Sequence, residues 1–306
     1  MLRTHPKTTF TVTITPFAED GRVDLDAYRR HLGRMRDADM GVYVAGSGSS
    51  EAYSLSDAEV DQILEASVEE LHGTVPVRAA GWESHNAADM IGLARRAARA
   101  GVDAVQIYSI DMGHGVLPTD AELEKFYRDV FDAVDTRFVI ATHESAGYRI
   151  PLPMLERLVA DYPQVIGINC THSDISYLTR IVDELDPRLE VHIGATQQAF
   201  ACMALGGTGY LTGEGNLAPR LCRSVTALYE SGDLTAAADA FAHVVRLYSA
   251  GNGSFASIRG TKAAMAARGL IENAACRAPF TPLTAEEKPL LDRLLAVVAD
   301  IPDELL

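Results

Sequence analysis

The sequence predicts a (β/α)8 TIM barrel followed by a C-terminal helical bundle. Short apolar segments alternate with amphipathic helical segments through the first two thirds of the chain. Eight such units follow one another, and eight parallel strands are the number that closes a barrel of this kind. After about residue 224 the pattern becomes helical throughout. We therefore expect a barrel over residues 1–224 and a helical extension over 225–306.

The predicted strands are short, apolar and rich in β-branched residues. They are FTVTIT (10–15), GVYVAG (41–46), PVRAAG (76–81), AVQIYS (104–109), RFVIAT (137–142), VIGIN (165–169), EVHIG (190–194) and GYLTG (209–213). The segments between them, such as DLDAYRRHLGRMRDA, repeat apolar residues at i, i+3, i+4 and i+7, which predicts helices. Ser56 and Asp120 stand where N-caps are expected, and Gly101 where a helix should end.

Composition excludes several classes of function. With 27 basic against 42 acidic residues the net charge is -15, and no Lys/Arg-rich run is present, so we expect no nucleic-acid partner. The chain has no run of about eighteen apolar residues and no apolar core near its start, so neither a membrane span nor a signal peptide is expected. Four scattered cysteines without CxxC spacing indicate a reduced, cytoplasmic protein.

Active sites of such barrels lie at the C-terminal ends of the strands. Polar and titratable residues gather in the segments that follow the predicted strands. These segments include GSGSSE (46–51), GWESHN (81–86), SIDMGHG (109–115), THESAGYR (142–149), NCTHSD (169–174) and ATQQ (195–198). We therefore expect a small-molecule substrate to bind there.

Several of these segments resemble the dihydrodipicolinate synthase / N-acetylneuraminate lyase family of pyruvate-type class I aldolases. ITPFAEDGRVDLDAYRRHL is similar to the family's opening motif, and GSGSSEAYSLS to its GxTGExxSL loop. IGIN resembles the strand that carries the Schiff-base lysine, GGTGY the start of strand 8, and LTAEEKPLLDRLL the last helix. The resemblance covers nearly the whole chain.

The resemblance implies a barrel that assembles as a homo-oligomer, usually a tetramer, with a dimer as the alternative. It implies that a strand 6 lysine forms an imine with a 2-keto acid, that a strand 5 tyrosine moves protons, and that the GxTGE loop holds the keto-acid carboxylate. An amine is needed as the nucleophile, because the protonated imine serves as the electron sink. No cofactor is implied.

The lysine position aligns with Asn169, whose amide nitrogen is not nucleophilic. We therefore expect that no imine forms at this residue. The chain has four lysines, and none of them stands at the end of a predicted strand: Lys7, Lys125, Lys262 and Lys288.

Two further family features are absent. Strand 5 ends in IATHESAGY, which places Thr142 or His143 near the tyrosine position. The tyrosine pair after strand 4 is replaced by Asp111 and Met112 or, with the gap moved, by His114 and Gly115. An ordinary pyruvate aldolase is therefore not expected, unless the alignment itself is displaced.

The predicted site combines acid/base groups with hydrogen-bonding groups. His143 titrates near neutrality and suits general acid or base chemistry, Tyr148 could supply a phenol instead, and Asn169 could polarise a substrate carbonyl or merely fill the space of a lysine. The predicted substrate-binding residues are Gly48, Ser49, Ser50, Thr142, Arg149 and Gly194. In the loop Glu51 is expected to be a structural anchor.

A metal site is not predicted. His114, His143 and His172 lie with Asp111, Glu144 and Asp174 on different loops, without HxH or HExxH spacing. Two functions from different classes remain open. One is a lyase-type enzyme acting on a small carboxylated carbonyl substrate without imine formation, and the other is a noncatalytic homologue that binds a keto acid or a partner protein.

Overall fold

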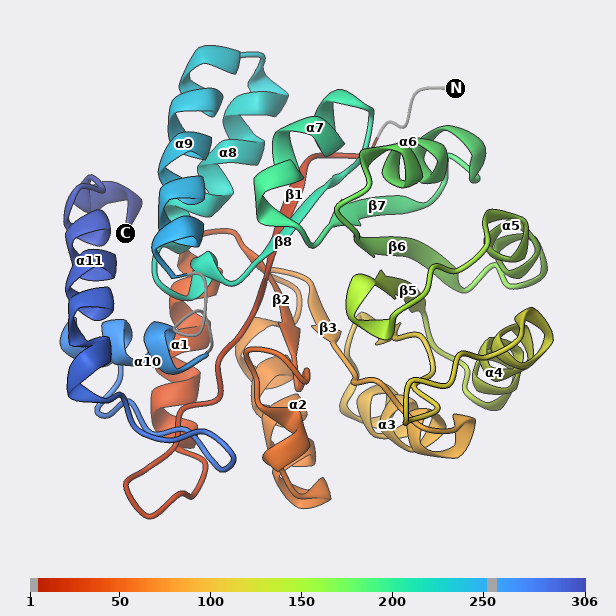
Figure 1. The fold of residues 1–306 in the computed structure, drawn as a ribbon, viewed down its shortest axis with the longest axis horizontal. Helices are drawn as coiled ribbons and strands as arrows, with labels where there is room; N and C mark the ends of the chain where they lie inside the picture. Colours follow the sequence, from red (N-terminus) through yellow and green to blue (C-terminus); the bar gives the residue numbers. More distant parts are fainter. Residues whose placement is uncertain (1–4, 252–257) are drawn as a thin grey trace. The chain divides into compact units, whose positions relative to one another are not determined.

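The computed structural model describes residues 5–251 and 258–306. Its strands follow the chain in the order β1 to β8 and close into a barrel (Figure 1), which confirms the predicted fold. The strands are β1 (Thr8–Val12), β2 (Gly41–Val44), β3 (Val77–Ala79), β4 (Ala104–Ile107), β5 (Phe138–His143), β6 (Val165–Thr171), β7 (Glu190–Ile193) and β8 (Gly209–Thr212).

Helices follow the strands as the alternating pattern predicts. They are α1 (Leu25–Asp37), α2 (Asp57–Leu71), α3 (Ala87–Ala100), α4 (Asp120–Ala133), α5 (Leu152–Asp161), α6 (Ile175–Glu184), α7 (Ala199–Ala204), α8 (Pro219–Ser231), α9 (Leu234–Ala250), α10 (Ile258–Ala267) and α11 (Lys288–Ala299). None of the helices in these described ranges is long and apolar enough to cross a membrane.

The chain divides into two compact units, which we describe separately. The first unit comprises residues 78–211 with His5 and Pro6, and the second comprises residues 7–77 and 212–306. The first holds β4 to β7 and α3 to α7, and the second holds β1, β2, α1, α2 and α8 to α11. The division at residue 224 between barrel and extension stays a prediction.

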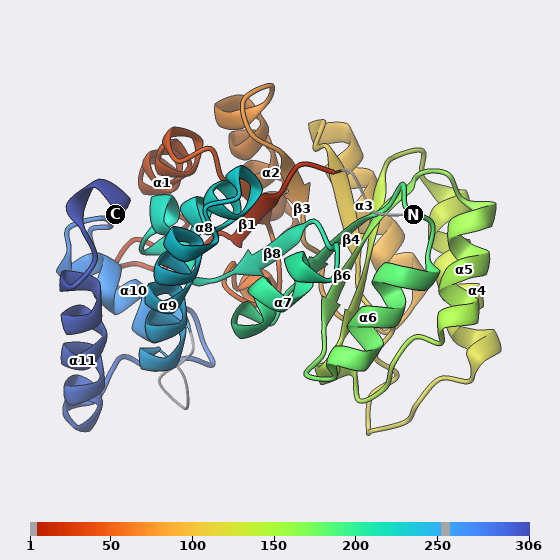
Figure 2. The ribbon, with the colours of Figure 1, turned by 90° about the horizontal axis from the view of Figure 1, so that it is seen from above.

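In the first unit, α3, α4, α5 and α6 lie along the outer side of strands β4 to β6, as Figures 1 and 2 show. Strands β4, β5, β6 and β7 pair in parallel. The register matters for the site, because residues in register on neighbouring strands point to the same face of a sheet, as do alternate residues along one strand. Ala141 of β5 is in register with Asn169 of β6, which is in register with His192 of β7.

In the second unit, α8 and α9 pack side by side, and α11 packs against α9 (Figure 1). The first strand spans Thr8–Val12 instead of the predicted 10–15. The backbone leaves the ladder after this strand because the Ile14 N–H donates to the Asn216 side-chain oxygen at 3.0 Å. At Ile14 the side chain of Asn216 thus takes the place of a backbone partner from a neighbouring strand.

Two of the three predicted helix boundaries are confirmed. Ser56 caps α2 in a capping box with Glu59, and Gly101 ends α3 at a φ of 86°, in the left-handed region that favours glycine. The N-cap of α4 is Thr119 and not Asp120, which lies in the first helical turn. The Thr119 hydroxyl and the Glu122 carboxylate form a reciprocal capping box, and this pairing decides between the two neighbouring candidates.

Candidate functional site

A partly buried ion pair identifies the interior face of the first unit. Arg78 of β3 meets Glu190 of β7 at 2.5 Å, although β4, β5 and β6 lie between these strands in the sheet order. Side chains of such separated strands can meet only inside the barrel. Glu190 is in register with Gly167 of β6, so Asn169, two residues further along β6, also faces the interior.

Asn169 is held there by a second amide. Its Nδ2 donates a hydrogen bond to Oε1 of Gln106 on β4, and each residue is only 2% exposed. Gln106 was not among the residues predicted for the site, although a polar residue inside the apolar strand AVQIYS was a visible signal. In this pair the Asn169 amide nitrogen is the donor and the Gln106 side-chain oxygen is the acceptor.

The neighbour of Asn169 on β5 is Ala141. Neither Thr142 nor His143 occupies that level of the strand, so the β5 neighbour of Asn169 offers no acid or base. On the other side, Asn169 is in register with His192 of β7, a buried imidazole. The next interior residue of β5 is His143, because it lies two residues beyond Ala141. Its ring lies 6.2 Å from that of Tyr108.

Hydrogen bonds settle which ring nitrogen of His143 carries the proton. The backbone N–H of Ser145 donates to His143 Nδ1 at 3.1 Å, so Nδ1 must be an acceptor. In the neutral ring the proton is therefore on Nε2. Burial lowers the pKa of His143, partly opposed by the nearby carboxylates of Glu83 and Glu144. His143 can thus donate from Nε2 as a neutral imidazole.

Thr142 faces the opposite way from His143, toward helix α6. Its hydroxyl lies 2.8 Å from His172 Nε2 and 3.4 Å from the Tyr177 hydroxyl, and the Tyr177 hydroxyl donates to the Ile150 carbonyl at 2.7 Å. Since the Tyr177 proton is used by Ile150, Tyr177 can only accept from the Thr142 hydroxyl, while the donor in the 2.8 Å contact between Thr142 and His172 depends on the His172 tautomer. The predicted contact of Thr142 with substrate stays a prediction; in this structure its hydroxyl holds His172.

Tyr148 and Arg149 both have protein partners. The Tyr148 hydroxyl donates to the Ile110 carbonyl at 2.7 Å, and burial raises its pKa to about 12. Tyr148 therefore stays protonated at neutral pH and is not a base there. The Arg149 guanidinium pairs with Asp174 at 2.6 Å and lies over the Tyr177 ring. Roles for Tyr148 in catalysis and for Arg149 in substrate binding stay predictions.

Gly194 lies just beyond β7, and its N–H donates to the Cys170 carbonyl at 2.7 Å. A Cβ atom at this position would collide with the Thr171 hydroxyl. Only glycine therefore leaves room for the Thr171 side chain, which lies two residues beyond Asn169 on the interior face of β6. This steric requirement explains why residue 194 is a glycine. The contact of Gly194 with substrate stays a prediction.

The GSGSSE loop belongs to the second unit. Gly48 is exposed and Ser49 is partly exposed, whereas Ser50 is buried and its hydroxyl donates to the Thr13 carbonyl at 2.7 Å. The Ser50 carbonyl in turn accepts from the Thr15 hydroxyl at 2.8 Å. Of the three predicted substrate-binding residues in this loop, Ser50 uses its hydroxyl for a hydrogen bond within the protein. The exposed half of the loop is Gly48 and Ser49.

Glu51 is fully buried and pairs with Lys262 of α10, which is also fully buried. The second Glu51 oxygen accepts the backbone N–H of Arg277 at 3.1 Å, and Lys262 also donates to the Ala275 carbonyl at 2.9 Å. Glu51 has a φ of 52°, which is uncommon for a residue with a side chain. These contacts fit the structural anchor expected of Glu51.

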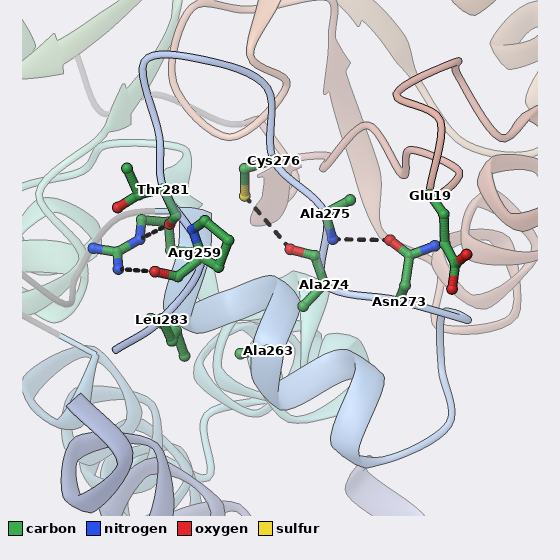
Figure 3. Close-up of a pocket in the computed structure, with 10 residues that line it drawn as sticks. Glu19, Arg259, Ala263, Asn273, Ala274, Ala275, Cys276, Thr281 and Leu283 are labelled. Atoms are coloured by element: carbon green, nitrogen blue, oxygen red, sulfur yellow. Dashed lines mark hydrogen bonds between the residues drawn. The ribbon is translucent and has the colours of Figure 1, made fainter. Parts of the chain in front are cut away.

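A cavity of about 520 Å³ lies within the second unit, lined by Glu19 and by residues of α10 and the segment after it (Figure 3). Its polar groups bind one another: Arg259 donates to the Thr281 carbonyl at 2.7 Å, and the Asn273 side-chain oxygen accepts from Ala275 N–H at 2.9 Å. None of the residues predicted for the site is among those that line this cavity.

Within residues 5–251 and 258–306, no three His, Cys, Asp or Glu side chains are grouped as a metal site requires. Two of the three histidines at these strand ends have protein partners. His172 bonds Thr142, and His143 Nδ1 accepts from Ser145.

Fold and site together define a (β/α)8 barrel protein with a polar amide and an imidazole on the interior face of neighbouring strands. The chain belongs to the dihydrodipicolinate synthetase family, whose model matches residues 5–298. This family comprises lyase-type, aldolase-like enzymes.

Named relatives cover most of the chain. A 4-hydroxy-tetrahydrodipicolinate synthase from Xanthomonas axonopodis pv. citri is 30% identical over 298 residues, covering 94% of this chain and 92% of the relative. The enzyme of that name from Bacillus subtilis is 26% identical and covers 91% and 94%.

Solved structures show the same fold. A dihydrodipicolinate synthase from Thermotoga maritima aligns with a TM-score of 0.86 at 22% identity, covering 96% of this chain and 99% of its own. A prophage protein of the family from Escherichia coli, solved in complex with pyruvate, aligns with a TM-score of 0.87 at 20% identity, covering 98% and 99%.

Proposed function

We propose that this protein is a lyase-type enzyme that acts on a small carboxylated carbonyl compound, similar to a 2-keto acid, without forming an imine. The observation that carries the proposal is the position of Asn169. It lies on the interior face of β6, with its amide nitrogen oriented by Gln106. An amide side chain in a buried, pre-oriented position can bind a carbonyl oxygen but cannot attack its carbon.

Asn169 would bind the substrate carbonyl. An amide nitrogen carries two N–H donors, so Asn169 can hold Gln106 and a carbonyl oxygen at the same time. A fixed donor in a buried site stabilises the negative charge that develops on such an oxygen when a neighbouring C–C or C–H bond breaks. Asn169 would thus stabilise the enolate directly, in place of an imine.

His143 would supply the second donor or move the proton. Its neutral ring carries the proton on Nε2, and burial lowers its pKa, so it remains neutral at physiological pH. A neutral imidazole can donate to a developing oxyanion without bringing a fixed positive charge. The Gly48–Ser49 part of the GSGSSE loop is proposed to contact the substrate carboxylate, which is the role that the resemblance implies for this loop.

Turnover tests this function directly. The purified protein is incubated with a panel of 2-keto acids and their aldol products, and each mixture is followed by proton NMR. Turnover of one compound should fall about 100-fold to 1,000-fold in Asn169→Ala, the cost of losing one oxyanion donor. The matched control is Lys125→Ala, which removes an exposed side chain paired with Asp129.

Two outcomes would redirect the proposal. Equal turnover by the wild-type protein and Asn169→Ala would exclude the role of Asn169. Tight binding of a keto acid without turnover across the panel would favour the alternative, a noncatalytic homologue that binds a keto acid or a partner protein.

Assembly and location remain as predicted from the sequence. We propose a homo-oligomer, a tetramer or a dimer, because the resemblance implies one, and a cytoplasmic protein because its four cysteines are scattered and unpaired in the sequence pattern. Sedimentation velocity of the purified chain measures the oligomeric state, and a monomer would contradict the proposed homo-oligomer.

A further inference from the structure

The loop after β5 holds a hydroxyl and an imidazole in close contact. Ser145 Oγ lies 2.6 Å from His143 Nδ1. Ser145 is exposed on the short 3-10 helix Glu144–Ala146, and His143 ends β5. We propose that Ser145 and His143 form a nucleophilic dyad that takes an acyl group from a small activated ester.

The direction of the hydrogen bond follows from the neighbouring contact. Because the Ser145 backbone N–H donates to His143 Nδ1 at 3.1 Å, Nδ1 carries a lone pair and no proton. The Ser145 hydroxyl is therefore the donor in the 2.6 Å contact. A serine whose proton already points at an imidazole lone pair meets the geometric requirement for an activated nucleophile.

Contacts on either side hold this loop in place. Glu144 accepts hydrogen bonds from the Ser173 backbone N–H at 3.2 Å and from its hydroxyl at 3.0 Å. The Gly147 N–H donates to the Glu144 carbonyl at 3.1 Å. The Glu83 carboxylate is a second acceptor for the Ser145 hydroxyl, at the longer distance of 3.5 Å. The loop is thus fixed while Ser145 stays open to a reagent.

The reaction step is an acyl transfer. Ser145 Oγ bonds to the carbonyl carbon of the ester as its proton passes to His143 Nδ1. The tetrahedral intermediate then breaks its bond to the alcohol oxygen, and the alcohol leaves with the proton from His143. Water attacks the acyl-serine by the same route and releases the acid, which returns the dyad to its starting state.

The experiment uses two reagents on the full-length protein. A fluorophosphonate probe is added at neutral pH, and the labelled peptide is identified by mass spectrometry. The release of nitrophenol from p-nitrophenyl acetate is followed in parallel. The expected result is one label on Ser145, together with a burst of nitrophenol matching the protein concentration.

Three variants separate the dyad from a merely exposed serine. Ser145→Ala should abolish the label and the burst. His143→Asn keeps an acceptor for the Ser145 N–H but removes the base, so labelling should slow by about 100-fold or more. Ser231→Ala is the matched control, because Ser231 is an exposed serine whose hydroxyl binds the Leu228 carbonyl, away from this loop, and it should leave labelling unchanged.

The dyad would be overturned if Ser145 is labelled no faster than Ser231, or if His143→Asn is labelled as fast as the wild type. Labelling should also fall as the pH drops below the pKa of His143, because the protonated ring cannot accept the serine proton. Both readouts are independent of the proposed lyase reaction, since neither requires its substrate.

Discussion

Ala141 of β5 lies in register with Asn169 of β6, so the two side chains share the interior face of adjoining strands. Asn169→Lys would place an amine on this face, next to a methyl group and near Gln106. We expect this variant to gain a mass adduct when it is treated with pyruvate and borohydride, whereas the wild type gains none. Aldol turnover should gain little, because Ala141 on β5 supplies no proton-transfer group and leaves only the His192 imidazole of β7 in register with the new amine.

The wild-type protein is the internal control for that experiment. Its one fully buried lysine, Lys262, is paired with Glu51, so it should remain unmodified. An adduct on any lysine of the wild type would contradict the non-imine mechanism and identify the residue that forms the imine.

The amide pair Asn169–Gln106 should stabilise the fold as well as orient the site. Gln106→Leu removes the acceptor of a buried N–H group, which costs about 1–3 kcal/mol of unfolding free energy. The double variant Gln106→Leu/Asn169→Leu should lose less than the sum of the two single variants, because no half of the pair is then left buried alone. Urea denaturation of the four proteins measures this; strictly additive losses would show that the two amides do not interact.

The ion pair between Glu51 and Lys262 is buried on both sides, unlike most ion pairs of this protein. Lys262→Met leaves the Glu51 carboxylate buried without its cation, and we expect a loss of about 3–5 kcal/mol. The exposed pair of Lys288 with Asp292 gives the control, since Lys288→Met should cost less than about 1 kcal/mol. Thermal unfolding of both variants checks the difference, and equal losses would contradict it.

Acid should weaken the contact between Glu59 and Arg277. Hydrogen bonds from the Arg277 guanidinium hold the pKa of Glu59 at about 2. A carboxyl whose folded-state pKa lies below its unfolded value stabilises the fold above the unfolded pKa, near 4.5, and loses that contribution as the pH falls toward 2.

The matched variant for this prediction is Glu59→Gln. Its unfolding free energy should fall less steeply than that of the wild type between pH 4.5 and 2. Parallel pH profiles for the two proteins would show that Glu59 contributes nothing to acid sensitivity.

Much of the barrel could be predicted because its signals are local. Apolar runs and helical periodicity depend on a few neighbouring residues, and they located all eight strands. The end of β1 could not be predicted in this way, since a distant side chain, that of Asn216, takes the N–H of Ile14. The N-cap of α4, in contrast, follows from a local signal, since Thr119 and Glu122 form the Thr-x-x-Glu pattern of a capping box.

The site was predictable in outline and less so in detail. Alignment with the family motifs led to Asn169, and the structure places it on the interior face of β6. Gln106 and Ser145 were not predicted, because their roles depend on contacts that form in the folded chain. Gln106 contacts Asn169 of β6, and the Ser145 hydroxyl contacts His143. The opposite directions of Thr142 and His143 follow from strand alternation, which fixes their faces only once the register is known.

The loops after β5 and β6 are tied together by Glu144 with Ser173 and by Arg149 with Asp174. Two segments that share such contacts are coupled, so we expect them to open together as one unit of local unfolding. Hydrogen exchange should therefore release the amides of Gly147 and Ser173 with a common opening free energy. Any ligand that orders one loop would, by the same linkage, slow exchange in the other.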